Sequence, residues 1–125
     1  MFTYYMKKIP SRCLYNIKIY KHGHEFGILN FQIQIQTKHA VLNNLEMNEK
    51  YCGYGSFFLK KFESYVSNIY DVKNIRLLAW QPSGDDKVVS FFKKHGYEEY
   101  SDVSKRQTYD DSIVIFDLHK MRKNI

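Results

Sequence analysis

The sequence has few glycines, prolines and cysteines and no long apolar run. Six glycines and two prolines in 125 residues are too few for a collagen-like or low-complexity chain. The longest apolar stretches, residues 77–80 and 113–116, fall far short of the roughly 20 residues that cross a bilayer. Lys7 and Lys8 are not followed by an apolar segment, so we expect no secretory signal and no membrane partner.

Cysteine is equally sparse. Cys13 and Cys52 are the two cysteines, and two thiols cannot provide the disulfide framework of a small secreted domain. We therefore expect a reduced, cytoplasmic protein. His22 and His24 have metal-ligand spacing, but without a third ligand nearby the pair is typical of a solvated turn, and we expect no metal site.

Core-forming side chains are abundant. Hydrophobic residues make up 44% of the chain and aromatic residues 17%, which predicts one compact domain over residues 1–125. Nineteen Lys and Arg residues against thirteen Asp and Glu residues give a formal net charge of +6. This balance attracts nucleic acids, phosphorylated cofactors and acidic proteins alike, so charge alone does not choose among them.

The first half of the chain has strand periodicity. Alternating apolar residues predict strands over residues 12–20, 26–36 and 39–47, with a hairpin turn over residues 21–24. Phe31, Ile33 and Ile35 are expected on one face of the second strand. In the third strand, Val41, Leu45 and Met47 are expected to face the core, while Leu42, Asn44 and Glu46 face the opposite side.

The period becomes helical after the third strand. A helix is predicted over residues 56–70, with an apolar stripe that ends at Ile69. A buried strand over residues 75–80 follows, which predicts a βαβ crossover with parallel strands. Asp85 or Asp86 is expected to cap a second helix that ends near Gly96. Two closing strands are predicted over residues 97–103 and 112–119.

The glycine-containing loop before the first helix is the most informative segment. A tight turn over Cys52, Gly53, Tyr54, Gly55 and Ser56 would let successive N–H groups converge at the positive end of the helix, which favours an anion. The physical inference is a phosphate site, although two glycines before a helix are as often a plain turn. Neither the P-loop nor the dinucleotide-binding pattern is present.

Two motifs in order resemble the GNAT superfamily of acyl-CoA N-acyltransferases. Residues 50–55, Lys-Tyr-Cys-Gly-Tyr-Gly, are similar to that family's [RQ]-x-x-G-x-[GA] signature. Residues 91–97, Phe-Phe-Lys-Lys-His-Gly-Tyr, are similar to its aromatic-Tyr-x-x-x-Gly-Phe landmark. The resemblance covers residues 12–118. It implies an α/β fold with a mixed sheet, in which an antiparallel meander leads into a βαβ unit whose parallel strands splay apart.

The resemblance also implies a cofactor and a reaction. The cofactor is acetyl-CoA, whose pantetheine arm would lie between the splayed strands while an amine attacks the thioester. Backbone N–H groups near Leu45 and Met47 would polarise the thioester carbonyl. The phosphate-side contacts would come from Lys50, Tyr51, Cys52, Gly53, Tyr54, Gly55 and Ser56.

Departures from the family pattern qualify individual roles. Lys50 stands where the family prefers Arg or Gln, which would leave phosphate binding to backbone amides. Asp85 lies near the position of a common CoA-contacting asparagine, and Phe92 occupies the position of a tyrosine that often protonates the departing thiolate. Glu46 is the candidate general base, because parity places it on the face away from the core. An exposed strand carboxylate with no role is an equally good interpretation of Glu46.

The short segment before residue 12 implies an open acceptor side, since GNAT proteins usually carry a strand and two helices there. An open, basic face favours an amine on a macromolecule, such as a protein or an aminoacyl-tRNA, and a homodimer could provide the missing wall. Two other classes stay open. One is a non-catalytic CoA-binding or protein-interaction domain, and the other is a basic nucleic-acid-binding module.

Overall fold

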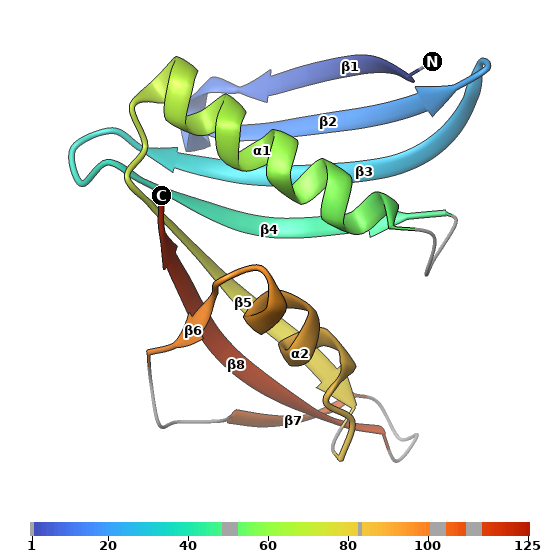
Figure 1. The fold of residues 1–125 in the computed structure, drawn as a ribbon, viewed down its shortest axis with the longest axis vertical. Helices are drawn as coiled ribbons and strands as arrows, with labels where there is room; N and C mark the ends of the chain where they lie inside the picture. The colour runs from blue at the N-terminus through green and yellow to red at the C-terminus, as the bar shows by residue number, and fades with distance from the viewer. Residues whose placement is uncertain (1, 49–52, 83, 101–104, 110–113) are drawn as a thin grey trace. The chain divides into compact units, whose positions relative to one another are not determined.

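The computed structural model describes residues 2–48, 53–82, 84–100, 105–109 and 114–125. These residues form two compact units, residues 1–75 with Ile125 and residues 76–124. Each unit is described by itself, and the prediction of one domain stays a prediction. Figure 1 shows the elements of both units.

The first unit is an antiparallel sheet with one helix. Its strands follow one another in sequence order across the sheet. They are β1 (Phe2–Ile9), β2 (Leu14–Lys21), β3 (His24–Gln34) and β4 (His39–Met47), with a three-residue 3-10 helix η1 (Pro10–Arg12) between β1 and β2. In Figure 1 the helix α1 (Tyr54–Tyr70) crosses one face of this sheet. The predicted antiparallel meander is therefore confirmed.

Local sequence explains the tightest turn of the sheet. β2 and β3 are joined through His22 and Gly23, which have φ values of 51° and 78°. Two residues with positive φ form the turn whose twist matches a β-hairpin, and glycine adopts this conformation without steric cost. The hairpin predicted over residues 21–24 is confirmed. The sequence did not predict β1, although it pairs with β2 along its whole length.

The core of the first unit lies between the sheet and α1. The buried side chains of α1 are Phe58, Leu59, Phe62 and Val66, and they pack against buried strand residues that include Ile19 and Phe31. The prediction that Ile69 and Ile35 belong to the core is wrong. Ile69 is 61% exposed because it lies in the last turn of α1, and Ile35 is 71% exposed because β3 ends at Gln34.

A β-bulge resets the alternation along β4. Asn30 pairs with Asn44 whereas Phe31 pairs with Leu42, so Asn43 is the extra residue. As a result Leu42 is 4% exposed on the α1 side, and Val41 pairs with Gln32 on the other face. The predicted sides of Val41 and Leu42 are therefore wrong, because strict alternation does not pass through a bulge.

The second unit is a smaller sheet with one helix. Its strands lie in the order β5, β8, β6, and β7 pairs with another part of β8. The elements of this unit are β5 (Asn74–Pro82), α2 (Lys87–Lys94), β6 (Glu98–Glu99), β7 (Lys105–Tyr109) and β8 (Val114–Asn124). β5 starts two residues before the boundary between the units. β6 is shorter than the predicted strand, and β8 extends to residue 124.

The helix α2 begins and ends at the predicted signals. Asp86 is its N-cap residue, and Gly96, two residues after its end, has a φ of 89°. A positive φ after a helix is the conformation that glycine adopts most easily. The α/β fold class is confirmed. Among the described residues, no helix has the length and apolar character needed to cross a membrane.

Candidate cofactor site

The loop that precedes α1 is described from Gly53 onward. The predicted contacts Lys50, Tyr51 and Cys52 lie outside the described residues. Gly53 has a φ of 80°, and a Cβ built on it would meet no atom of the described residues within 4 Å. Glycine is required here by the backbone conformation rather than by crowding. The described residues thus leave the space beside Gly53 open for a ligand that approaches the backbone closely.

The N-terminus of α1 carries no negative charge of its own. Its N-cap residue, Gly53, has no side chain, and its first turn holds no acidic residue. The first intrahelical hydrogen bond runs from the Phe57 N–H to the Gly53 carbonyl, over 3.1 Å. The preceding amides therefore point out of the end of the helix, where the helix dipole favours an anion. Tyr54, Gly55 and Ser56 contribute these amides.

A lysine lies beside this helix end. The Lys21 Nζ is 5.4 Å from the centre of the Tyr54 ring and 5.5 Å from that of Phe26, and it donates a hydrogen bond of 3.3 Å to the Tyr54 hydroxyl. Tyr54 also packs edge-on against Phe26. An aromatic cluster thus fixes a cation beside the side chain of Tyr54, the first residue of α1.

The end of β4 is fixed by close packing against β3. Met47 pairs with Gly27, where a Cβ would approach the Met47 Cε within 2.6 Å and the Glu46 carbonyl oxygen within 2.8 Å. Only glycine leaves room for the Met47 side chain at this position. The Asn48 side chain extends the anchorage, donating a 2.6 Å hydrogen bond to the Glu25 carbonyl.

The predicted sides of Leu45, Glu46 and Met47 are confirmed. Leu45 packs against the core cluster that contains Phe58, and Met47 belongs to that cluster. Glu46 lies between them in the strand and is exposed, so its carboxylate is on the face opposite α1. It pairs with Ile28 of β3. The carboxylate is accessible to a substrate on that face.

Asp85 has a local role in the second unit. Its Oδ1 accepts a hydrogen bond of 2.9 Å from the Lys87 N–H, the first residue of α2. Of the two residues predicted to cap α2, Asp86 thus occupies the N-cap position and the Asp85 carboxylate makes the hydrogen bond to the first helical amide. Its predicted contact with CoA stays a prediction.

Phe92 is a core residue of the second unit. Its side chain is 9% exposed and makes edge-on contacts with Phe91 and Tyr97, with ring centres 5.1 Å and 5.5 Å apart. A buried phenyl ring has no proton to donate, so no general acid stands at this position. Its predicted place in a cofactor site also stays a prediction.

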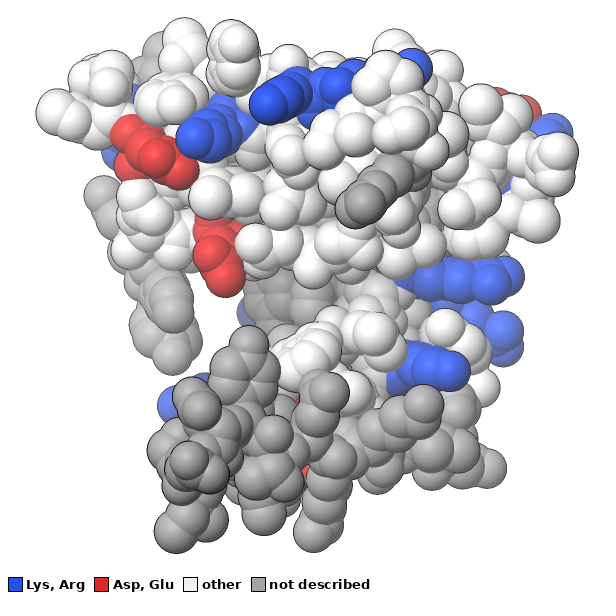
Figure 2. Space-filling view, turned by 180° about the vertical axis from the view of Figure 1, so that it is seen from behind, with Lys and Arg blue, Asp and Glu red and all other residues white. Residues whose placement is uncertain are grey.

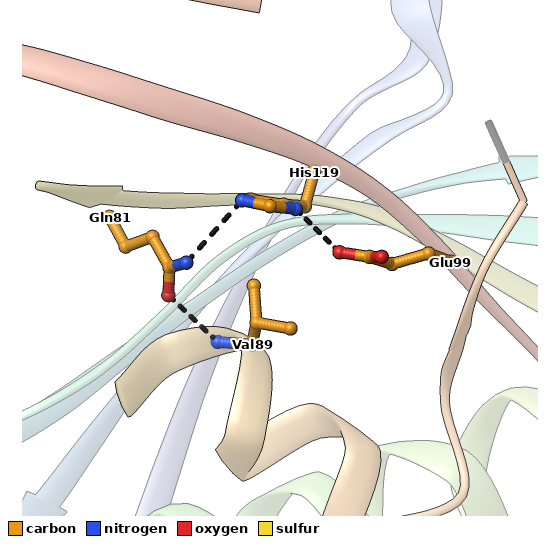
Figure 3. A network of polar contacts seen from close by, with 4 residues as sticks. All are labelled: Gln81, Val89, Glu99 and His119. Atoms are coloured by element: carbon orange, nitrogen blue, oxygen red, sulfur yellow. Dashed lines mark hydrogen bonds and ion pairs between the residues drawn. The ribbon is translucent and has the colours of Figure 1, made fainter. Parts of the chain in front are cut away.

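A polar network joins four elements of the second unit (Figure 3). The Gln81 Oε1 of β5 accepts a 3.1 Å hydrogen bond from the Val89 N–H in the first turn of α2. The Gln81 Nε2 then lies 3.4 Å from the His119 Nε2. Because the amide nitrogen is a donor, the His119 Nε2 is the acceptor. The His119 Nδ1 lies 2.5 Å from the Glu99 Oε1. The network fixes α2 to β5, β8 and β6.

The structure thus brings Leu45, Met47, Gly53, Tyr54, Gly55 and Ser56 together within the first unit. Sequence reasoning missed Lys21 and Gly27, which support this site from β2 and β3. No local motif marks either residue, because each contacts a residue distant in the sequence. Lys21 contacts Tyr54, and Gly27 lies against Met47. The alternation of β2 places Lys21 on the same side as Ile19, and that is the one sequence signal that could have found it.

The face opposite α1 is mostly uncharged (Figure 2). In the upper part of that view, a few basic and acidic side chains stand among uncharged ones. The strand residues on this face include Asn16, Tyr20, Asn30 and Gln32, interspersed with Lys7 and Lys18. Among the described residues of the first unit, uncharged side chains thus outnumber charged ones on the strands of this face.

No protein-family model and no curated protein matches this sequence. Solved structures, in contrast, match it over nearly its whole length. A spermidine N-acetyltransferase from Vibrio cholerae superposes with a TM-score of 0.75 at 12% identity, over 92% of this chain and 67% of that protein. An IAA acetyltransferase from Bacillus cereus gives 0.74 at 11% identity, with both chains covered completely.

A third match is Tetrahymena GCN5, with a TM-score of 0.66 at 20% identity over 91% of this chain and 69% of that one. These proteins share an architecture with the present chain but little sequence. At such identities the similarity establishes the fold. The chain therefore has the fold of the GNAT acetyltransferases.

Proposed function

We propose that this protein is a GNAT-type acyltransferase that transfers an acetyl group from acetyl-CoA to an amine. The observation that carries the proposal is the N-terminus of α1, where outward-pointing amides, an uncapped Gly53 and the nearby Lys21 form an anion site on a GNAT fold. The pyrophosphate of CoA is the anion that this fold would hold there. One solved structure of the Vibrio cholerae spermidine N-acetyltransferase is a complex with CoA and spermine, which supports the choice of ligand.

When bound, acetyl-CoA supplies a thioester whose carbonyl carbon forms a bond to the amine nitrogen while its bond to sulfur breaks. The chain's own part is to bind, orient and polarise. The amides of Tyr54, Gly55 and Ser56 would hold the phosphates, and backbone N–H groups at Leu45 to Met47 would stabilise the negative charge that develops on the carbonyl oxygen. Lys50, Tyr51 and Cys52 are proposed to complete the phosphate loop.

Proton transfer is assigned to Glu46 and to water. An amine must lose its proton before it attacks, and the exposed Glu46 carboxylate on the face opposite α1 can accept that proton. Because Phe92 cannot act as an acid, the departing thiolate is proposed to take its proton from water. Glu46→Gln is expected to lower the rate at neutral pH by roughly 100-fold, and by less at higher pH, where more of the amine is unprotonated.

The acceptor is proposed to be an amine on a protein or an aminoacyl-tRNA. The link between β1 and β2 is only the four residues 10–13, of which three form η1, so within these described residues no helical wall encloses a small acceptor. Small polyamines nevertheless belong in the assay, because a structural neighbour is a spermidine N-acetyltransferase. A cytoplasmic location and a homodimer are part of the same proposal.

The test has two stages. Mass spectrometry of the purified protein, followed by calorimetric titration with CoA, measures binding. Release of free thiol from acetyl-CoA is then measured with peptide amines, aminoacyl-tRNA and spermidine. Thiol release with at least one amine supports the enzyme. CoA binding without turnover of any acceptor would instead support the non-catalytic CoA-binding domain, which the phenylalanine at position 92 favours.

A basic nucleic-acid-binding module is the remaining alternative. It predicts binding to an arbitrary duplex or tRNA that persists near physiological salt and does not require CoA. Nonspecific binding that depends only on net charge falls steeply with salt through counterion release. We expect this second behaviour, because the basic side chains on the face opposite α1 have acidic and uncharged side chains beside them.

A further inference from the structure

The first unit contains an apolar groove that the proposed reaction does not use. It has a volume of about 780 Å³ and lies between α1 and the face formed by β1, β2 and β3. Its floor is apolar and mostly buried, and is formed by Ile17, Ile19, Leu29, Phe58 and Phe62. Its rim is open, since Tyr4, Met6 and Phe57 are 49%, 44% and 43% exposed.

The described charged residues that line the groove have one sign. Lys60 and Lys61 are among its lining residues, and no aspartate or glutamate is among the described residues of that lining. The Lys61 Nζ is 5.0 Å from the centre of the Phe57 ring and 5.8 Å from that of Tyr4, so it reaches across the rim from α1 to β1. Two lysines without a carboxylate would repel an ammonium group. The groove is therefore unsuited to the amine acceptor and suited to an anion.

The shape of the groove sets the length of its occupant. Its lining residues on α1 run from Phe57 to Asn68, a distance of about 16 Å along the helix axis. An extended chain of about twelve carbons has this length. At the far end, the Tyr65 hydroxyl approaches the Met6 sulfur at 3.9 Å, so a second contact spans the groove between α1 and β1.

We propose that this groove binds a free fatty acid, with the hydrocarbon chain along the floor and the carboxylate beside Lys60 and Lys61. The ligand combines the two features of the groove, a long apolar floor and an acid-free cationic rim. Binding is independent of the cofactor site, which lies at the N-terminal end of α1. The inference therefore stands or falls separately from the proposed acetyl transfer.

A chain-length series tests the apolar floor. Calorimetric titration with octanoate, decanoate and dodecanoate, each below the concentration at which it self-associates, is expected to show affinity rising about tenfold for each two carbons. Dodecylamine and dodecanol are the matched controls for the head group, and both are expected to bind at least tenfold more weakly than dodecanoate. Equal affinities for the three twelve-carbon compounds, or no dependence on chain length, would overturn the proposal.

Neighbouring residues of β1 provide a matched pair of variants. Met6 lines the groove, whereas Tyr5 lies on the opposite face and is 66% exposed. Met6→Glu is expected to weaken dodecanoate binding at least tenfold, and Tyr5→Glu to change it less than twofold. Lys61→Glu should also weaken binding about tenfold, with Lys18→Glu on the other face as its control. Circular dichroism verifies that each variant is folded.

Two further measurements separate the rival explanations. Dodecanoate affinity is expected to be unchanged at saturating CoA and in Gly55→Asp, and displacement by CoA would show that the acid only occupies the cofactor site. Light scattering at the titration concentration measures the oligomeric state. A dimer that dissociates in Met6→Glu but not in Tyr5→Glu would show that a second copy of the chain covers the groove, and would overturn the proposal.

Discussion

The two helices are stabilised in opposite ways. α2 has eight residues, and two amides of its first turn are bound by side chains, the Lys87 N–H by Asp85 and the Val89 N–H by Gln81. Its last turn contains two lysines, Lys93 and Lys94. Negative charge at the start and positive charge at the end both complement the helix dipole. A short helix with few buried side chains depends on such end contacts.

α1 has none of these favourable charges. It has 17 residues, no acid in its first turn and no base in its last turn, and an aspartate, Asp71, follows its end. Its stability comes instead from a buried stripe that includes Phe58, Leu59 and Phe62. Because packing holds the helix, its N-terminus does not need a carboxylate cap. This difference teaches that a helix stabilised by packing can leave its N-terminus without an acidic cap.

The largest expected effect comes from adding a carboxylate to the open helix end. Gly55→Asp places negative charge and bulk where the phosphates are proposed to bind, so CoA affinity should fall at least 100-fold, as measured by calorimetry. Helix stability should not fall in parallel, because an acid in the first turn suits the dipole. Ser90→Asp adds the same charge to α2 and is the control. Wild-type affinity in folded Gly55→Asp would refute the site.

Removing the cap of α2 should have an intermediate effect. Asp85→Ala deletes the acceptor of the Lys87 N–H, and loss of such a cap typically costs about 1 kcal/mol. The free energy of unfolding, measured with urea, should fall by this amount, while Asp85→Asn should retain most of it. If Asp85 also contacts CoA, calorimetry would show that Asp85→Ala lowers CoA affinity in the folded protein.

The entry to α1 should be sensitive to backbone conformation rather than to charge. Gly53→Ala forces a side chain into a left-handed conformation and should cost about 1 kcal/mol. Asn tolerates this conformation better, so Gly53→Asn should be closer to the wild type in urea unfolding. Equal destabilisation by both substitutions would point to crowding at Gly53, contrary to the open space beside it.

The smallest effect concerns the acid at the end of α1. The Asp71 carboxylate lies 2.9 Å from the Lys73 Nζ and 3.1 Å from the Lys38 Nζ. Hydrogen bonds to Lys73 and then Lys38 lower the pKa of Asp71 below its usual 3.8. A lowered pKa in the folded state gives stability that is present above pH 3.8 and lost as the pH falls through the folded pKa.

Asp71→Asn should therefore reduce the dependence of stability on pH below pH 4, while the amide keeps the positive φ of 55° accessible. All three side chains are more than half exposed, so solvent screening keeps the effect small. Acid unfolding followed by circular dichroism measures it. An unchanged acid profile in the variant would show that the ion pairs contribute nothing.

Local signals were sufficient to predict much of this structure. The hairpin at Gly23, the helix α1 and the glycine after α2 each depend on a few neighbouring residues. The exposed edge strand β1 was missed because most of its side chains are exposed, which leaves no burial pattern to detect. The bulge at Asn43 was missed because a pair of adjacent asparagines does not show in the sequence that one of them lies outside the strand alternation.

The candidate site, like the fold, could be predicted from the sequence only where it depends on neighbouring residues. The glycine loop and the side of Glu46 follow from the spacing of nearby residues. The aromatic cluster around Lys21 and the contact between Gly27 and Met47 instead join residues that are distant in the sequence. The contacts at residues 50–52 lie outside the described residues. Sequence alone thus predicts an anion site at this loop, which stays a prediction, but not the contacts that Lys21 and Gly27 make from the neighbouring strands.

The bulge in β4 has a consequence for how this strand tolerates insertions and deletions. Leu42 and Leu45 both face α1, although they are three positions apart, because Asn43 is absorbed by the bulge. Loss of one of the paired asparagines would leave regular alternation and keep every later side chain on its present face. Loss of Leu45 would turn that carboxylate toward the core. Length variation in β4 is therefore tolerable at one point, and the two asparagines mark it.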